Sequence, residues 1–261
     1  MIEEFKSIPI EKIAIDHTFH VTTLIKILDE EGSKRQFVAL LLVLNEVGLV
    51  SRFMLCKSES LWELERVLRD LGVSNTITEA FTDDCCKHRQ ILQHFFGEQL
   101  IVYLDLFHAE NRVTRNVGRK SLKKGRFGEF CKDLTYCFRQ EMDKKVDKNG
   151  KGIGRTMATP SQAEIIHNLN QLKNDWQKEL PEKAIKEIDK LITEHSGCLA
   201  NMPPKSGTAK NENCHKKLRA FFASKRNLSL GKSINSVRYF GLFLTYLSMY
   251  LLPTQIGSEF V

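Results

Sequence analysis

Several features that would place a protein in a defined class are missing from this 261-residue sequence. The opening residues, MIEEFKSIPI, contain no basic segment followed by an apolar segment, so they predict no signal peptide. The most apolar stretch, residues 239–252, is shorter than the ~20 residues that a membrane-spanning helix needs. We interpret it as a buried or partner-packing helix and expect no membrane partner. Internal repeats and low-complexity tracts are also absent.

The cysteines do not form the pattern of a disulfide-bonded secreted domain. Their number is odd, with no repeated spacing, at positions 56, 85, 86, 131, 137, 198 and 214. This usage favours a reducing compartment. The spacings typical of zinc ribbons and zinc fingers do not occur, so the sequence does not predict a cysteine-bound structural metal. We interpret the neighbouring Cys85 and Cys86 as packing residues.

Acidic residues are outnumbered, and in two segments they are nearly absent. The chain carries 39 Lys and Arg against 32 Asp and Glu, for a formal net charge of +7. Residues 112–126 contain seven basic side chains and no acid, and a second basic cluster follows Glu212. Such clusters suit a polyanion and predict contacts with DNA phosphates. The predicted DNA-binding residues are Arg112, Arg115, Arg119, Lys120, Lys123, Lys124, Arg126, Lys216, Lys217 and Arg219.

Apolar patterning predicts an α/β protein. The first 110 residues indicate the order β-β-β-α-β-α-β, with a hairpin turn at NEVG, residues 45–48. Residues 127–198 predict only helices. One of these is expected to begin at TPSQ, with Thr159 as N-cap and Pro160 at the first helical position. Its apolar stripe predicts core positions at Ile165, Leu169, Leu172 and Trp176.

The length and the 42% hydrophobic content suit one large domain that carries an insertion. We expect residues 8–115 to form the first part of the core. Residues 116–203 are then a basic linker and a helical insertion, and residues 204–252 return to the core as C-terminal helices. This layout, with three strands, a helix, a strand, a helix, a strand and a late helix, is that of an RNase H-like domain with a mixed sheet.

Three acids fall at the element ends where such a fold brings carboxylates together. Asp16 ends the first strand, Asp83 ends the fourth with Asp84 beside it, and Glu212 lies near the start of a late helix. Carboxylates are the hard ligands that Mg²⁺ prefers, and two such ions can activate a nucleophile and stabilise the leaving oxygen of a phosphodiester. Taken alone, Glu212 is explained as an acid that complements a helix dipole.

Four short strings together resemble the catalytic domain of eukaryotic cut-and-paste DDE transposases, of the Mutator-like and related superfamilies. They are IAIDHTFHV, FTDDCC, LDLFHAENR and SGTAKNENCHKKL. The first resembles the D-x-T-F context of the first acid, and the second ends a strand in Thr-Asp. The last resembles the string G-T-x-x-x-E-x-x-H of the third acid. The resemblance covers roughly residues 8 to 250 and implies Asp16, Asp83 and Glu212 as catalytic metal ligands.

The resemblance also implies residues near that site. Asp105 and His108 in DLFH fit a C/D-x-x-H signature, although a purely structural pair is the alternative. His215 follows Glu212 by one helical turn and either faces the site or only neighbours the acid. Asp84 is a helix cap or a supporting residue, and the choice between Asp83 and Asp84 as second ligand stays open.

The function implied by the resemblance is DNA strand cleavage and strand transfer with two Mg²⁺ or Mn²⁺ ions. The expected partners are transposon-end and target DNA, with action as a homodimer on DNA and a nuclear location. One alternative is a domesticated transposase-derived domain that binds DNA or protein without transposition. A further alternative is an RNase H-like nuclease, which the long insertion and the GTxxxE helix disfavour.

Overall fold

The computed structural model divides the chain into two compact units. The sheet unit comprises Met1–Ala80, His88–Ile101 and Thr208–Val261, and the helical unit comprises Phe81–Lys87 and Val102–Gly207. The residues that the structure describes are 10–19, 22, 27–29, 32–34, 37–71, 76–118, 122, 125–139, 158–203 and 209–223.

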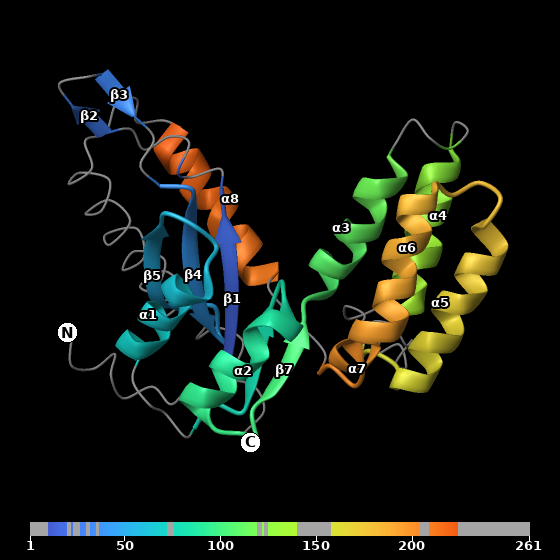
Figure 1. Cartoon of the computed structure of the whole chain (residues 1–261), viewed down its shortest axis with the longest axis horizontal. Coiled ribbons are helices and arrows are strands. Elements are labelled where there is room, and N and C mark those ends of the chain that lie inside the picture. Colours follow the sequence, from blue (N-terminus) through green and yellow to red (C-terminus); the bar gives the residue numbers. More distant parts are fainter. Residues whose placement is uncertain are drawn as a thin grey trace, which may run out of the picture. The chain divides into compact units, whose positions relative to one another are not determined.

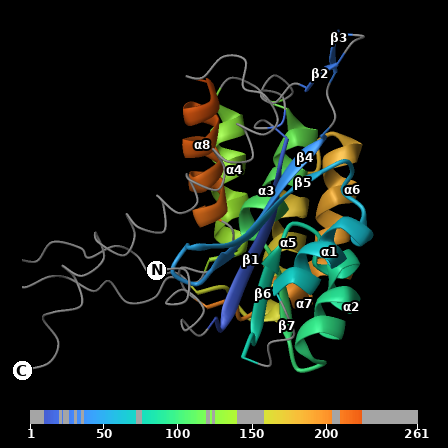
Figure 2. The ribbon, with the colours of Figure 1, turned by 90° about the vertical axis from the view of Figure 1, so that its left-hand side faces the viewer.

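A five-stranded mixed sheet has the order β5-β4-β1-β6-β7 (Figures 1 and 2). Its strands are β1 (Lys12–Thr18), β4 (Ala39–Asn45), β5 (Val50–Cys56), β6 (Glu79–Thr82) and β7 (Ile101–Leu104). Every residue of β4 is buried, as expected for an apolar strand covered on both faces. The final residues of β6 and β7 are grouped with the helical unit. The α/β class predicted from the sequence is therefore confirmed.

Strands β1, β4 and β5 form an antiparallel meander. In the register of β1 with β4, Asp16 lies opposite Leu42. The turn between β4 and β5 is the predicted one: Gly48 N donates to Asn45 O at 2.9 Å, with Gly48 at a φ of 86° that favours glycine. A short second sheet of β2 (Ile27–Asp29) and β3 (Gly32–Lys34) is an element that the apolar pattern did not indicate.

Strands β6 and β7 are parallel neighbours. Ile101 N donates to Thr78 O at 3.0 Å and Asp105 N donates to Thr82 O at 2.9 Å, so the hydrogen bonds advance in the same direction along both strands. Helix α2 (Cys85–Phe96) connects them, as a parallel crossover requires. The predicted order β-β-β-α-β-α-β is found in the main sheet, with helix α1 (Leu61–Leu71) as its first helix.

Helix α8 (Ala209–Ala223) packs on β1 and β4 within the sheet unit (Figure 1). Its described side chains divide into two faces. Cys214, His215 and Leu218 are buried, whereas Lys216, Lys217 and Arg219 are exposed. The expected N-cap, Thr208, lies outside the described residues, as does the apolar segment 239–252.

The helical unit is built from α3 (Leu106–Val117), α4 (Arg126–Cys137), α5 (Gln162–Trp176), α6 (Glu182–Lys190), the π turn η3 (Leu191–His195) and α7 (Ser196–Leu199). Helix α3 packs on α6, and α4 packs on α5 (Figure 1). The predicted α5 stripe is buried at all four positions. The rings of Phe130 and Trp176 meet edge to face at 5.4 Å, which fills the space between α4 and α5.

The start of α5 differs from the prediction. Its N-cap is Ser161 rather than Thr159, and Ser161 forms a reciprocal capping box with Glu164. Thr159 has another role, because its hydroxyl accepts a hydrogen bond from Met202 N. A local sequence pattern does not reveal that long-range bond. The predicted N-cap therefore lies two residues before the observed one. Among the described helices, none is long and apolar enough to cross a membrane.

Candidate functional site

Asp16 is a carboxylate in the interior of the sheet unit. It lies on β1, is 0% exposed, and its Oδ2 is 3.5 Å from Nδ1 of His215 on α8. His215 is buried as well. Removing an ionised carboxylate from water costs several kcal/mol unless an opposite charge or hydrogen-bond donors compensate. The first acid of the predicted set is therefore buried beside an imidazole, at a position where an ionised carboxylate requires a compensating charge or hydrogen-bond donors.

Glu212 precedes His215 by one helical turn on α8. Residues three apart share a helix face, so the backbone of α8 carries Glu212 on the side that presents His215 to β1. The prediction that Glu212 lies on a helix is confirmed. The exposed basic residues Lys216, Lys217 and Arg219 follow on the same helix.

Asp83 and Asp84 come directly after β6, and the structure separates their roles. Asp84 Oδ1 accepts from Lys87 N at 3.4 Å, which makes Asp84 a cap of the α2 N-terminus. The Asp83 carboxylate accepts from the Thr82 hydroxyl at 3.3 Å, and its backbone oxygen accepts from Arg112 Nη2 at 2.5 Å. The cap predicted for Asp84 is confirmed, and the choice of Asp83 over Asp84 as metal ligand stays a prediction.

Asp105 caps helix α3. Its buried carboxylate accepts from His108 N at 3.2 Å. This local bond is the structural pairing that the sequence left as an alternative, while a role of His108 near a reaction site stays a prediction. The His108 ring is half-buried and meets the edge of the Phe107 ring at 5.6 Å.

The predicted DNA-binding residues fall into three groups. Arg115 on α3 and the three basic residues of α8 are exposed. Arg126 pairs with Glu129 and Glu179, each at 2.6 Å, and its guanidinium lies 4.3 Å from the centre of the Trp176 ring. Arg112 is also engaged inside the helical unit, as described below. The others, Arg119, Lys120, Lys123 and Lys124, lie outside the described residues.

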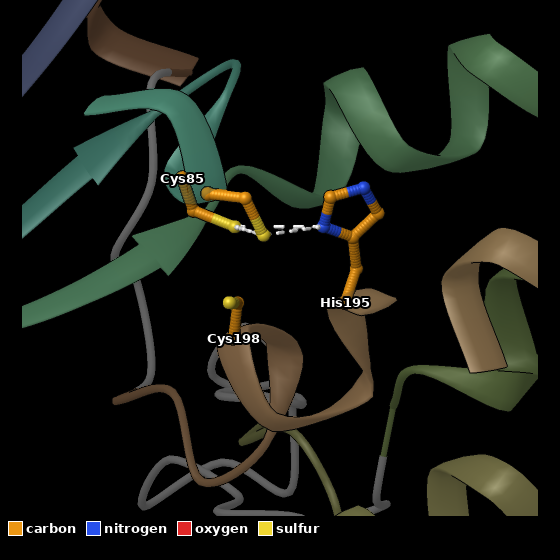
Figure 3. Close-up of side chains that lie close together, drawn as sticks. Cys85, His195 and Cys198 are labelled. Atoms are coloured by element: carbon orange, nitrogen blue, oxygen red, sulfur yellow. Dashed lines mark hydrogen bonds between the residues drawn. The ribbon is translucent and has the colours of Figure 1, made fainter. Parts of the chain in front are cut away.

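A cluster that the sequence did not predict lies within the helical unit. The sulfurs of Cys85, Cys86 and Cys198 and a ring nitrogen of His195 all lie within 4.8 Å of one another. Figure 3 shows the Cys85 and His195 side chains directed toward a common point, with the Cys198 sulfur facing them from α7. We call these four residues the Cys3His cluster. Cys86 is exposed, and the other three members are buried.

Hydrogen bonds link the Cys3His cluster to the segment that carries Asp83. His195 Nδ1 is 3.3 Å from Cys86 Sγ and 3.6 Å from Cys85 Sγ. On the other side of the ring, Arg112 Nη1 is 3.3 Å from His195 Nε2. The neighbouring Cys198 and burial raise the pKa of the Cys85 thiol. Arg112 thus joins the cluster to the backbone oxygen of Asp83, which accepts from its other amino group.

Sequence reasoning missed the cluster because its two halves are far apart. Cys86 and His195 are 109 residues apart, so no short motif contains both. The only local signals were the adjacent cysteines 85 and 86 and the spacing His195-x-x-Cys198. Either pattern alone is too short to separate ligands from packing residues.

Comparison of this chain with protein-family models and with curated proteins finds no match. The fold and the described side chains define its class: an α/β protein with a five-stranded mixed sheet and with groups that can hold a metal ion. The Cys3His cluster, which lies entirely within the helical unit, is such a group.

Proposed function

We propose that this protein cleaves and joins DNA strands by metal-dependent phosphoryl transfer, as DDE transposases do. Asp16, Asp83 and Glu212 are the proposed ligands of two Mg²⁺ or Mn²⁺ ions. The observation that carries the proposal is the contact between buried Asp16 on β1 and His215 on the helix that bears Glu212. Because Glu212 precedes His215 by one turn on that helix, the contact supports the assignment of the first and third acids to one site.

The arrangement of the sheet supports the RNase H-like part of the proposal. Strand β1 lies at the centre, with the β4–β5 meander on one side and the parallel pair β6–β7 on the other. Asp83 follows β6, the strand next to β1 in the sheet order. The chain then inserts helices before returning to the sheet unit as α8. This sequence of elements is the one that the resemblance to transposases implies.

The donor set fits hard divalent cations. Mg²⁺ takes carboxylate and water oxygens and avoids sulfur, and a fully buried carboxylate such as Asp16 benefits from a nearby cation. Bound divalent cations in such a set supply activation of a water or a DNA 3′-hydroxyl and stabilisation of the leaving oxygen.

The chain's own residues orient that set. His215 Nδ1 lies 3.5 Å from the Asp16 carboxylate, and Asp84 caps the start of α2 beside Asp83. Lys216, Lys217 and Arg219 face solvent on α8 and are the proposed contacts to DNA phosphates, because exposed basic side chains bind the backbone through charge. We propose that the active form is a homodimer bound to DNA and that it acts in the nucleus.

Nicking of supercoiled plasmid with Mg²⁺ or Mn²⁺ tests the proposal. Wild type is expected to nick only with the metal, and Glu212→Gln is expected to lower the rate by at least ~100-fold, because it removes one charged ligand. Asp16→Asn and Asp83→Asn should do the same. Matched controls are Glu182→Gln on α6 and Asp175→Asn on α5, whose exposed side chains should leave the rate unchanged.

Two outcomes decide against the enzyme. The first is nicking that persists in Glu212→Gln at the wild-type rate, which would assign the activity to another site or to a contaminant. The second is no nicking by folded wild type together with DNA binding that weakens steeply with salt. The exposed basic face of α8 favours that alternative, a DNA-binding domain without strand transfer.

A further inference from the structure

We propose that Cys85, Cys86, His195 and Cys198 form a closed structural Zn²⁺ site inside the helical unit. The site would tie the segment after β6, which carries Asp83 and Asp84, to helix α7. This inference concerns a second metal of a different chemical kind from Mg²⁺. It stands independently of the phosphoryl-transfer proposal.

The distances within the Cys3His cluster match the edges of a zinc tetrahedron. Zn–S bonds of about 2.3 Å and Zn–N bonds of about 2.0 Å place two sulfurs about 3.8 Å apart and a sulfur and a nitrogen about 3.6 Å apart. The structure has Cys85 Sγ and Cys86 Sγ at 3.7 Å, and His195 Nδ1 at 3.6 Å and 3.3 Å from them. Cys198 Sγ is within 4.8 Å of the other donors, so a shift of at most about 1 Å completes the tetrahedron.

The types of donor atom favour Zn²⁺, and their number and burial indicate that the ion has a structural role. Thiolates and an imidazole are ligands of Zn²⁺ and other soft or borderline ions, whereas Mg²⁺ and Ca²⁺ require oxygen. Four protein donors leave no open coordination position for a substrate or a catalytic water. Three members of the cluster are buried, and exposed Cys86 provides the route by which the ion enters.

The chain is built locally to present these donors. His195 ends the π turn η3, and Cys198 lies three residues later on α7, so both project from one helical face. Single π turns within helices are often found at functional sites because they rotate one side chain out of the regular α-helical series. The other pair, Cys85 and Cys86, begins α2 directly after the cap Asp84.

A basic side chain beside the cluster supplies the charge that the site needs. Three thiolates with one Zn²⁺ carry a net negative charge, and the Arg112 guanidinium beside His195 balances it. Without metal, Arg112 can only donate, so His195 Nε2 accepts and the ring proton lies on Nδ1. With metal on Nδ1, the ring proton would lie on Nε2, so the Arg112 guanidinium would have to shift away from that nitrogen.

Metal analysis of the full chain, purified under reducing conditions and dialysed, tests the site. We expect one tightly bound zinc per chain, and Co²⁺ added to the metal-free chain should give the absorption of tetrahedral thiolate-bound cobalt. Cys86→Ser should weaken metal binding by at least ~10-fold. Because Cys86 is exposed, this variant is expected to fold even where Cys85→Ser or Cys198→Ser does not.

Two sets of controls separate this site from other causes. Cys131→Ser changes a half-buried cysteine of α4 outside the cluster and should keep the zinc. Glu212→Gln and Asp16→Asn should also keep it, even where they abolish nicking. The proposal is overturned if the reduced, folded chain binds neither Zn²⁺ nor Co²⁺, or if Cys131→Ser loses as much metal as Cys86→Ser. A disulfide among the cluster cysteines in place of bound metal, seen by mass spectrometry of the unreduced chain, would also overturn it.

Discussion

The two compact units of this protein use different side chains to hold their interiors together. In the sheet unit the described core is mainly aliphatic, with every residue of β4 buried and Ile13 and Ile15 beside Asp16 on β1. In the helical unit aromatic rings and cysteines join the aliphatic residues of the described core. Trp176 shows the difference: it meets Phe130, donates to Asp133, and lies under the Arg126 guanidinium.

This difference affects how function can be recognised in each unit. An apolar strand gives a local signal in the sequence, and an acid within it is conspicuous, as Asp16 is. The expectation that Asp16 ends the first strand is wrong, because β1 continues to Thr18 through its pairing with β4. The helical unit joins residues from distant segments through specific polar contacts, as Arg112 does between Asp83 and His195. The sequence therefore indicated the candidate ligands that a local strand pattern marks. It did not indicate those that distant segments bring together.

The largest expected stability effect tests the aromatic core of the helical unit. Trp176→Ala should lower the free energy of unfolding by about 3–5 kcal/mol, because it leaves a cavity and an unpaired partner at Asp133. Urea denaturation measures the change. The matched control is Trp62→Ala, since Trp62 is 61% exposed and Trp176 is 4% exposed. Equal losses from the two substitutions would contradict the packing described here.

Removal of zinc tests the cluster that distinguishes the helical unit. At free Zn²⁺ about 100-fold above the dissociation constant, bound metal should stabilise the fold by about 2.7 kcal/mol. A zinc chelator should therefore lower the melting temperature of wild type and of Cys131→Ser. It should have little effect on Cys86→Ser. A chelator effect of the same size in Cys86→Ser would show that the stabilising ion is held elsewhere.

The corrected start of α5 predicts a smaller effect. Ser161→Ala removes the hydroxyl that accepts from Glu164 N and donates to Glu164 Oε2, and should cost about 1 kcal/mol. Denaturant unfolding of Ser161→Ala and Glu164→Gln measures it. The loss in Glu164→Gln should be the smaller of the two, because glutamine can still accept from Ser161 N. If Ser161→Ala has the same free energy of unfolding as wild type, an earlier residue must cap the helix.

The smallest effect concerns Glu110 on α3. Burial raises the pKa of its carboxyl group, although Arg139 and Thr135 oppose that shift. The folded state therefore binds this proton more tightly than the unfolded chain does. The stability it contributes is present below the unfolded pKa of about 4.3 and is lost as pH rises through the higher folded pKa.

The variant Glu110→Gln removes that pH dependence. At pH 7 it should be more stable than wild type by on the order of 0.5 kcal/mol, and the difference should vanish in acid. Urea denaturation at both pH values measures it. A variant that is less stable than wild type at pH 7 would mean that the contacts of Glu110 with Arg139 and Thr135 outweigh its burial.

The elements of the main sheet were predictable because their signals are local. Apolar runs predicted β4 and β5, and NEVG predicted their turn, since only nearby residues decide a hairpin. The cap at Asp84 was predicted for the same reason. The start of α5 was not, because the bond from Met202 N to Thr159 removes the expected cap. The strands β2 and β3 have three residues each and are too short to give a periodic signal.

From its sequence alone, this protein is determined to be α/β in class, with helix α8 carrying Glu212 and with a net positive charge. Periodicity and composition are properties of short segments, so no folded coordinates are needed to read them. Tertiary structure alone decided that His215 reaches Asp16 and that Cys85 and Cys86 meet His195 and Cys198. Those contacts join residues far apart along the chain, and only the packing of whole elements brings their side chains within bonding distance.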